Sequence, residues 1–175
     1  NIVSNEKNIL IIDFEVFKNY LVIIESIKNK QNLKIFNLKN NILDNVLNFK
    51  EDFYELNFEN NININDTCVR FSYSSLKTPK ETYEYNFLEK TCNLIKTKNI
   101  LKFNKEDYET YSLDVLSRDN KLIPVSILYK KDLNLNFKKE NKNNKKYPVL
   151  LYAYGAYGHS VSLSFSHSII SLIDR

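Results

Sequence analysis

Short apolar segments recur along roughly the first hundred residues, at intervals of about a dozen positions. Each segment is alternating or continuous in apolar character and ends in a polar cluster rich in Asn and Lys, which predicts β-strands with short connections. Regularly spaced short strands are typical of a sandwich, a barrel or propeller blades. The predicted strands cover residues 20–26, 33–38, 53–58, 67–73, 82–87 and 93–97.

The pattern changes after about residue 105. Residues 108–116 and 122–129 have strand character and flank the sequence Arg-Asp-Asn-Lys at 118–121. Asp and Asn tolerate the positive φ of a tight turn, so this stretch predicts a β-hairpin.

The remaining residues predict a loop followed by the start of an α/β layer. Residues 131–146 are almost wholly Asn, Lys and Glu, the composition of an exposed loop. We expect a buried strand at 148–153, then a tight turn containing Gly155 and Gly158, then a helix at 166–173. Those two residues are the only glycines of the chain, and reactive groups of α/β enzymes often follow buried strands.

Charge and hydropathy exclude several partners. The formal net charge is +4, and the basic residues are scattered among Asn and acidic residues without interleaved aromatics, unlike a nucleic-acid-binding surface. No apolar run approaches the roughly 20 residues that cross a bilayer, and the first residues do not show the charged region and apolar core that mark a secretory signal. We therefore expect no nucleic acid, no membrane and a cytoplasmic location. A chain that starts with Asn1 instead of Met is expected to be a fragment.

The two cysteines suggest no metal chemistry. Cys68 and Cys92 lack the close spacing of a metal knuckle, and two cysteines neither demand nor exclude a disulfide. We expect two buried free thiols in a reducing compartment, with no metal and no cofactor.

Four separated stretches carry a family resemblance. They contain the sequences NYLVIIE, RFSYSSLKTP, PVSILY and YPVLLYAYGAYG. The stretches are residues 19–25, 70–79 with YEY at 83–85, 119–131, and 147–158 with 165–166 and 171–175. In this order they resemble the prolyl oligopeptidase family of serine peptidases, and its oligopeptidase B branch most closely.

The resemblance implies a seven-bladed β-propeller joined to an α/β-hydrolase domain. Residues 1–105 would be the C-terminal part of the propeller, and residues 106–175 the start of the catalytic domain. It also implies hydrolysis of short peptides by acyl transfer, after basic residues, with the propeller restricting entry to small or unfolded substrates. The remainder of the same polypeptide would then be needed for a complete fold.

Two tyrosines occupy motif positions of the family. Tyr154 matches the tyrosine whose hydroxyl donates to the oxyanion of the tetrahedral intermediate, and a neutral phenol is a competent donor. Tyr157 matches an aromatic wall of the substrate pocket. Packing under a strand end is the alternative for Tyr154, and core packing for Tyr157. Ala153 and Ile169 depart from the glycine and arginine that the family and the branch commonly have there.

A catalytic serine is missing from the sequence. A Gly-x-Ser-x-Gly elbow needs glycines on both sides of the serine, and the two glycines here flank Ala156 and Tyr157. His159 and His167 do not occupy the family's catalytic position, so we expect turn and helix residues there. The resemblance places the triad, and the acidic residues that select Lys or Arg, after Arg175.

Two functions from different classes remain open. The first is an internal part of an oligopeptidase. The second is a non-catalytic β-rich interaction module. Unpaired strand edges and an uncovered sheet would leave the isolated chain poorly folded or aggregating, which argues against the module.

Overall fold

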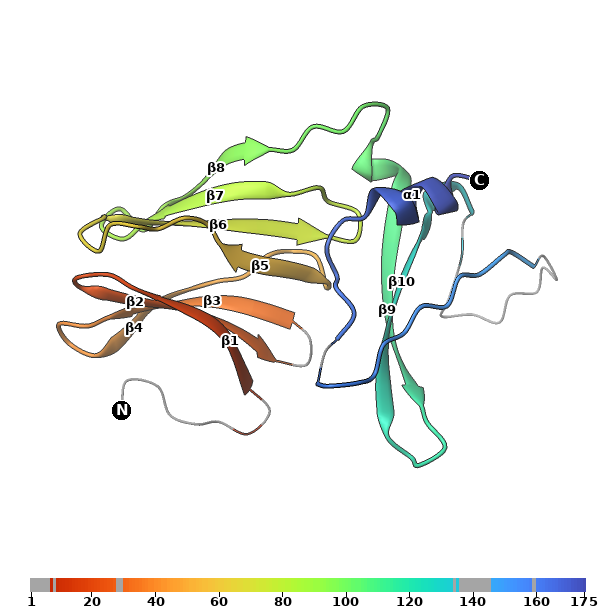
Figure 1. Cartoon of the computed structure of the whole chain (residues 1–175), viewed down its shortest axis with the longest axis horizontal. Helices are drawn as coiled ribbons and strands as arrows, with labels where there is room; N and C mark the ends of the chain where they lie inside the picture. Colours follow the sequence, from red (N-terminus) through yellow and green to blue (C-terminus); the bar gives the residue numbers. More distant parts are fainter. Residues whose placement is uncertain (1–6, 8, 28–29, 134, 136–145, 159) are drawn as a thin grey trace.

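The computed structural model describes residues 7, 9–27, 30–133, 135, 146–158 and 160–175 (Figure 1). These residues form mainly antiparallel β-strands, with two 3₁₀ turns and one short helix. The elements are β1 (Ile9–Val16), β2 (Tyr20–Ile27), β3 (Lys30–Asn37), β4 (Ile42–Leu47), β5 (Tyr54–Phe58), β6 (Cys68–Ser75), β7 (Glu81–Asn86), β8 (Cys92–Thr97), η1 (Lys105–Asp107), β9 (Tyr108–Leu116), β10 (Leu122–Lys130), η2 (Lys131–Leu133) and α1 (His167–Ile173).

The first eight strands form two four-stranded antiparallel sheets. In each sheet the strands lie side by side in chain order, β1 to β4 and β5 to β8. Consecutive strands can pair because the turns between them are short. Asn41 and Lys90 adopt the positive φ values that tight turns require, 56° and 55°. Two successive four-stranded meanders are the form expected of propeller blades.

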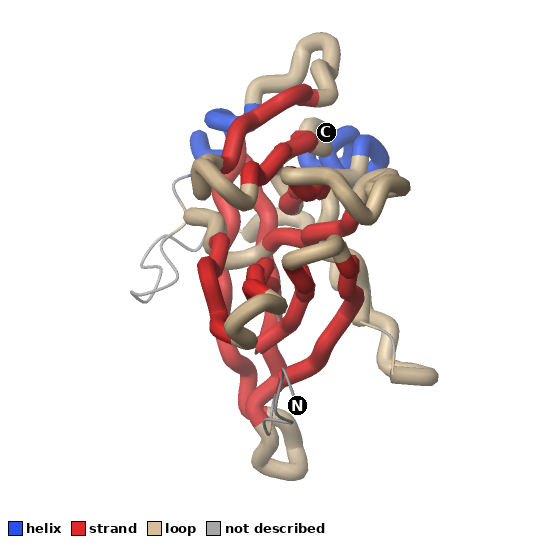
Figure 2. Tube along the Cα trace, turned by 90° about the vertical axis from the view of Figure 1, so that its left-hand side faces the viewer, coloured by secondary structure: helices blue, strands red, loops and turns tan. Residues whose placement is uncertain are grey.

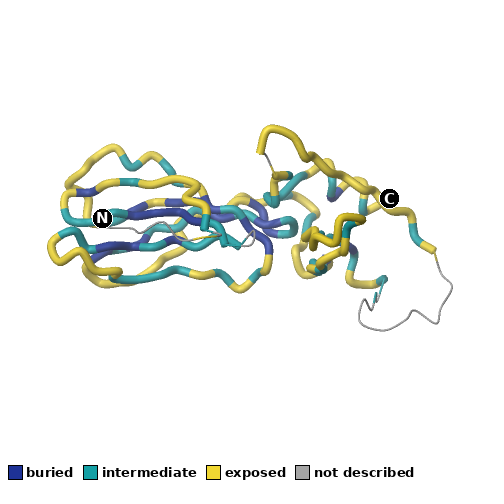
Figure 3. Tube along the Cα trace, turned by 90° about the horizontal axis from the view of Figure 1, so that it is seen from below, coloured by how far each residue is buried: buried dark blue, intermediate teal, exposed yellow. Residues whose placement is uncertain are grey.

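Residues of both four-stranded sheets form the hydrophobic core. Figure 3 shows the buried residues gathered in the middle of this part of the chain. Alternate residues of each central strand point into the core, for example Val22 and Ile24 on β2 and Phe71 and Tyr73 on β6. Aromatic rings fill much of the space, including Tyr20 stacked on Phe87 at 4.3 Å between ring centroids. The buried members are Phe17, Val22, Ile24, Leu33, Ile35, Tyr54, Leu56, Val69, Phe71, Tyr73, Tyr85 and Phe87.

The six predicted strands are confirmed, with ends that shift by up to three residues. The structure adds β1 and β4, which were not predicted. On β4 the apolar pattern is interrupted by Asp44 and Asn45, and on β1 most side chains are exposed. β1 contains the apolar, β-branched run ILII, which is a strand signal in the sequence. Pairing with β3 forms β4 despite its interrupted pattern.

The predicted hairpin is also confirmed. Strands β9 and β10 pair in continuous register from Tyr108 opposite Lys130 to Leu116 opposite Leu122. The turn is closed by a hydrogen bond from the Ser117 amide to the Lys121 carbonyl at 2.8 Å, and Asn120 has a φ of 60°. Most of the predicted loop at 131–146 lies outside the described residues.

The short helix α1 is confirmed and begins one residue later than predicted, at His167. Ser166 is its N-cap, and its hydroxyl accepts a hydrogen bond from the Ile169 amide. Ile170 is buried, whereas Leu172 is 53% exposed. Figures 1 and 2 show that α1 lies at the end of the hairpin opposite its connecting turn.

Several strands expose large apolar side chains, and β1 and the β9–β10 hairpin are two such places. On β1 they include Leu10 and Phe14, which are 66% and 60% exposed, and on the hairpin they include Leu116 and Leu122. Soluble monomers rarely expose extended apolar patches, so these surfaces are of the kind that another protein layer covers.

Candidate functional site

The segment 147–158 carries both candidate tyrosines and forms no strand. Val149, Leu150 and Leu151 are 86%, 67% and 83% exposed, so the expectation of a buried strand at 148–153 is wrong. A strand needs a neighbouring strand for its backbone hydrogen bonds. Within the part of the chain that the structure describes, β9 and β10 pair with each other and provide no such neighbour to this segment.

Neither candidate tyrosine is buried. The Tyr154 side chain is 51% exposed and that of Tyr157 is 91% exposed. Both therefore present an accessible phenol on one irregular segment. The exposure of Tyr157 does not fit core packing, the alternative considered for it, and Tyr154 lies on a segment that forms no strand for it to pack under.

The expected tight turn is formed at the second glycine. Tyr157 and Gly158 have φ values of 56° and 70°, two consecutive residues in the left-handed region. A Cβ added at Gly158 would meet no atom within 4 Å, so the requirement for glycine comes from the backbone angle. Gly155 has no positive φ, and a Cβ there would also meet no atom within 4 Å.

The structure describes one of the two histidines. His159 lies outside the described residues. His167 is exposed at the start of α1 and makes an edge-on ring contact with Phe165 at 5.2 Å. This agrees with the expectation of a helix residue at 167.

The far end of α1 is fixed to the hairpin by a three-residue cluster. The Tyr108 hydroxyl donates to the Asp174 carboxylate at 2.7 Å, and the Lys130 ammonium lies 3.1 Å from the same oxygen. The hydrogen bond from Tyr108 and the nearby ammonium hold the pKa of Asp174 below its ordinary value. Burial and the same hydrogen bond raise the pKa of Tyr108 to about 12.

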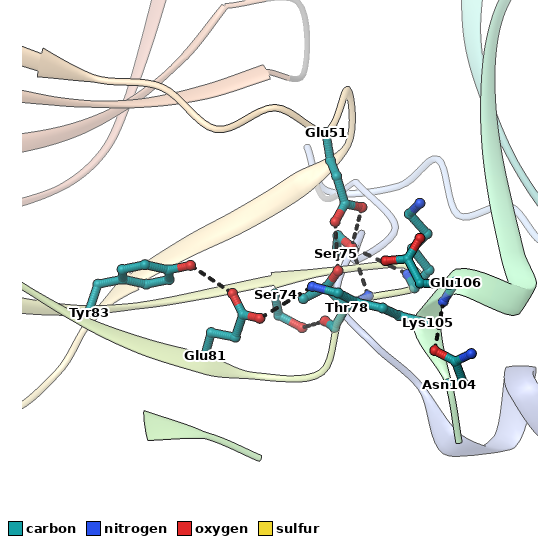
Figure 4. A network of polar contacts seen from close by, with 10 residues as sticks. Glu51, Ser74, Ser75, Thr78, Glu81, Tyr83, Asn104, Lys105 and Glu106 are labelled. Carbon is teal, nitrogen blue, oxygen red and sulfur yellow. Dashed lines mark hydrogen bonds and ion pairs between the residues drawn. The ribbon is translucent and has the colours of Figure 1, made fainter. Parts of the chain in front are cut away.

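A second polar cluster joins the turn after β6 to the entry of the hairpin (Figure 4). The Glu51 carboxylate accepts hydrogen bonds of 2.6 Å from the hydroxyls of Ser75 and Thr78. On β7, Glu81 accepts a 2.8 Å hydrogen bond from the Tyr83 hydroxyl and lies 3.7 Å from the Lys105 ammonium. The cluster therefore ties η1 to the second sheet.

A shallow cleft of about 370 Å³ lies between the second sheet and residues 164–167. Its walls include the ion pair of Lys80 and Glu59, whose nitrogen and oxygen are 2.6 Å apart. Hydrogen bonding to Lys80 lowers the pKa of Glu59. Neither Tyr154 nor Tyr157 lines this cleft. The lining residues are Glu55, Asn57, Phe58, Glu59, Asn60, Ser72, Ser74, Lys80, Lys98, Ser164, Phe165 and His167.

The cysteines are free, but the expectation that both are buried is wrong. Cys68 is half-buried at the start of β6, and Cys92 is exposed at the start of β8. The described ranges contain no group of three or more His, Cys, Asp or Glu side chains that could hold a metal ion. No helix among the described residues is long and apolar enough to cross a membrane.

The sequence did not predict how the segment after the turn is held. Glu55 on β5 accepts hydrogen bonds from Ser162 and Leu163, more than a hundred positions later in the chain. Glu55 lies between the buried residues Tyr54 and Leu56 on a predicted strand. The strand pattern therefore predicts that its side chain is on the face opposite to theirs, but it does not predict which residue binds it.

Curated relatives align along most of the chain. Dipeptidyl aminopeptidase BI of Pseudoxanthomonas mexicana is 28% identical over 174 residues, which cover 99% of this chain and 23% of that protein. The prolyl endopeptidase of Elizabethkingia meningoseptica is 32% identical over 103 residues, or 59% of this chain and 13% of that protein. The chain thus spans about a quarter or less of these relatives.

Solved structures show the same fold. Oligopeptidase B from Trypanosoma brucei, in a closed form with covalently bound antipain, superposes with a TM-score of 0.83 at 21% identity. That match covers 99% of this chain and 24% of the other. Oligopeptidase B from Leishmania major gives the same TM-score at 20% identity and the same coverage.

The family comparison agrees with the two stacked meanders. Residues 1–98 match the family model described as "Prolyl oligopeptidase, N-terminal beta-propeller domain". These residues make up more than half of the chain and contain the first eight strands. The chain belongs to the prolyl oligopeptidase family, and the sheets β1–β4 and β5–β8 are part of its β-propeller.

Proposed function

We propose that this chain is the region of a serine oligopeptidase in which the propeller leads into the catalytic domain. Residues 1–105 are assigned to the last propeller strands, and residues 106–175 to the first part of an α/β-hydrolase domain. The complete enzyme hydrolyses short peptides by acyl transfer, and its serine, aspartate and histidine are supplied outside this chain.

One observation carries the proposal. The alignment with dipeptidyl aminopeptidase BI runs along 99% of the chain, whereas the propeller model matches residues 1–98. Residues beyond 98 therefore align with a peptidase outside that propeller match. The exposed apolar surfaces of β1 and the hairpin support the same proposal, because further layers of a larger protein would cover them.

In the proposed reaction Tyr154 stabilises the tetrahedral intermediate. A serine hydroxyl loses its proton to a histidine and attacks the carbonyl carbon of the substrate, and the carbonyl oxygen becomes an oxyanion. The Tyr154 hydroxyl donates a hydrogen bond to that oxygen and keeps its proton. A backbone N–H next to the serine is the second donor.

Tyr157 is proposed to form a wall of the substrate pocket. A planar ring can flank the residue that precedes the scissile bond, and the positive φ of Tyr157 sets the direction of its side chain. We assign the enzyme to the oligopeptidase B branch on the four sequence stretches described above, and we therefore propose cleavage after Lys or Arg.

The test uses the natural full-length protein. We expect a fluorophosphonate probe to label one serine, and peptides with Arg or Lys before the scissile bond to be cleaved faster than matched peptides with Pro. Cleavage only after Pro would contradict the branch assignment. No labelling and no hydrolysis of any peptide would contradict the peptidase function and support the non-catalytic interaction module.

A further inference from the structure

Residues 162–165, here called the attachment segment, are hydrogen-bonded to the second sheet at two neighbouring side chains. One Glu55 oxygen accepts from the Leu163 amide at 2.7 Å, and the other accepts from the Ser162 hydroxyl at 3.0 Å. The Phe165 amide donates to the Ser74 hydroxyl at 3.1 Å. Glu55 and Ser74 are directly opposite each other in the pairing of β5 with β6.

The Ser74 hydroxyl has a fixed orientation. It donates to the Thr78 carbonyl at 3.0 Å and accepts from the Phe165 amide, so its hydrogen and an oxygen lone pair are both used. Both carboxylate oxygens of Glu55 accept a hydrogen bond from the attachment segment. The sheet therefore holds the attachment segment through three directed hydrogen bonds, two of them to a charged group.

The attachment segment is also held from the other side. The Phe165 ring packs edge-on against Phe103 at 4.9 Å, and Phe103 stacks on Tyr108 at 5.2 Å. The helix α1 follows immediately, and its end is fixed through Asp174. Figure 1 shows the segment passing the end of β5 and entering α1.

This attachment lies eight positions after Tyr154 in the chain. Residues 155–158 of the intervening turn are exposed, and the backbone hydrogen bonds of the described residues include none that links residues 148–158 to a strand. The attachment therefore fixes the chain on the C-terminal side of the turn that carries Tyr154. Small displacements of a donor weaken the stabilisation of an oxyanion, because the hydrogen bond depends on distance and angle.

We propose that Glu55 is a positioning residue for Tyr154: through Ser162 and Leu163 it fixes the attachment segment, which follows the turn that carries the oxyanion donor, to the propeller sheet. This inference rests on the proposed function, in which Tyr154 donates to the oxyanion. Glu55 does not touch substrate in this role. Its effect on the reaction passes through the position of the tyrosine.

The experiment measures kcat and KM of the full-length peptidase with a peptide substrate. Glu55→Ala removes both acceptors, and we expect kcat to fall about tenfold with KM changed less than twofold. Glu55→Gln keeps a carbonyl oxygen for the Leu163 amide and should retain at least a third of the wild-type kcat. Glu84→Ala is the matched control, because Glu84 pairs with Arg70 on the same sheet and does not contact the attachment segment.

A double-mutant cycle separates positioning from simple stability. In a Tyr154→Phe background the hydroxyl is already absent, so Glu55→Ala should lower kcat by less than twofold further. A tenfold loss in both backgrounds, or no loss from Glu55→Ala in the wild type, would overturn the inference. If Glu55→Ala does not fold, the same cycle is run with Glu55→Gln, and equal losses in both backgrounds overturn it. An unchanged kcat for Tyr154→Phe alone would instead refute the proposed function.

Discussion

Replacing Glu51 with alanine should open the turn between β6 and β7. Ser75 and Thr78 are 0% and 1% exposed, and their hydroxyls each donate to Glu51 at 2.6 Å. A hydrogen bond to a charged group contributes about 1.5 to 3 kcal/mol. Glu51 is itself half-buried, so water can replace part of what is lost. We therefore expect a local destabilisation of about 2 to 4 kcal/mol for Glu51→Ala.

Hydrogen exchange measured by mass spectrometry on the full-length protein tests this directly. The Thr78 amide donates to the Ser75 hydroxyl at 2.9 Å, and the Ser75 amide donates to the Thr78 carbonyl at 3.0 Å. A loss of about 2 to 4 kcal/mol corresponds to roughly 30- to 1,000-fold faster exchange in a peptide covering these residues. Glu51→Gln, which retains one acceptor oxygen, should give a smaller increase.

The control for this measurement is Glu89→Ala. Glu89 is exposed in the turn between β7 and β8, and its described hydrogen bond uses the backbone amide. Its substitution should leave exchange around Thr78 unchanged. If Glu51→Ala accelerates exchange by less than about fivefold, or no more than the control does, the two buried hydroxyls do not depend on Glu51 and the reasoning is wrong.

Three further predictions concern Tyr108, Asp174 and Cys68. Tyr108→Phe removes the hydrogen bond to Asp174 and should destabilise the docking of α1 by about 1 kcal/mol, read as faster exchange in α1. The pKa of Asp174 is lowered in the folded protein, so the stability that its carboxylate gives to the docking of α1 is present above the ordinary pKa of 3.8. That stability is lost as the pH falls through the lower folded pKa. Acidification below about pH 4 should therefore release α1 in the wild type and have less effect in Tyr108→Phe. Burial and, to a smaller extent, the Glu84 carboxylate raise the pKa of the Cys68 thiol. Iodoacetamide should therefore modify Cys68 more slowly in the native protein than in urea at about pH 8. Glu84→Gln should reduce this difference in rate between the native and the unfolded protein. Equal rates in the folded and unfolded protein would contradict the thiol prediction.

Local patterns predicted the central strands of both sheets. The alternation of Val22 and Ile24 on β2, and of Phe71 and Tyr73 on β6, follows from the pleat of a strand packed on the core. The residues between them, Ile23 and Ser72, are buried as well, so both faces of these strands are covered at these positions. The hairpin turn at Asn120 was predictable because its side chain tolerates positive φ. Periodicity alone did not distinguish a sandwich, a barrel and propeller blades. The family resemblance indicated propeller blades.

Long-range contacts were beyond such patterns. The run from Val149 to Leu151 has the composition of a buried strand, yet burial depends on neighbouring strands that no local sequence specifies. The attachment of Leu163 to Glu55 joins residues more than a hundred positions apart, and a strand pattern indicates only the face on which Glu55 lies. Its partner could be identified only from the folded chain.

The most direct test of the account is the kcat of Tyr154→Phe in the full-length peptidase. Loss of one oxyanion donor should lower kcat by roughly 10²- to 10³-fold, about 3 to 4 kcal/mol, with little change in KM. Tyr152→Phe is the control, since Tyr152 is an exposed tyrosine on the same segment and should retain the wild-type kcat. A decrease smaller than about threefold for Tyr154→Phe, or an equal decrease for both variants, would contradict the assignment of Tyr154 to the oxyanion hole.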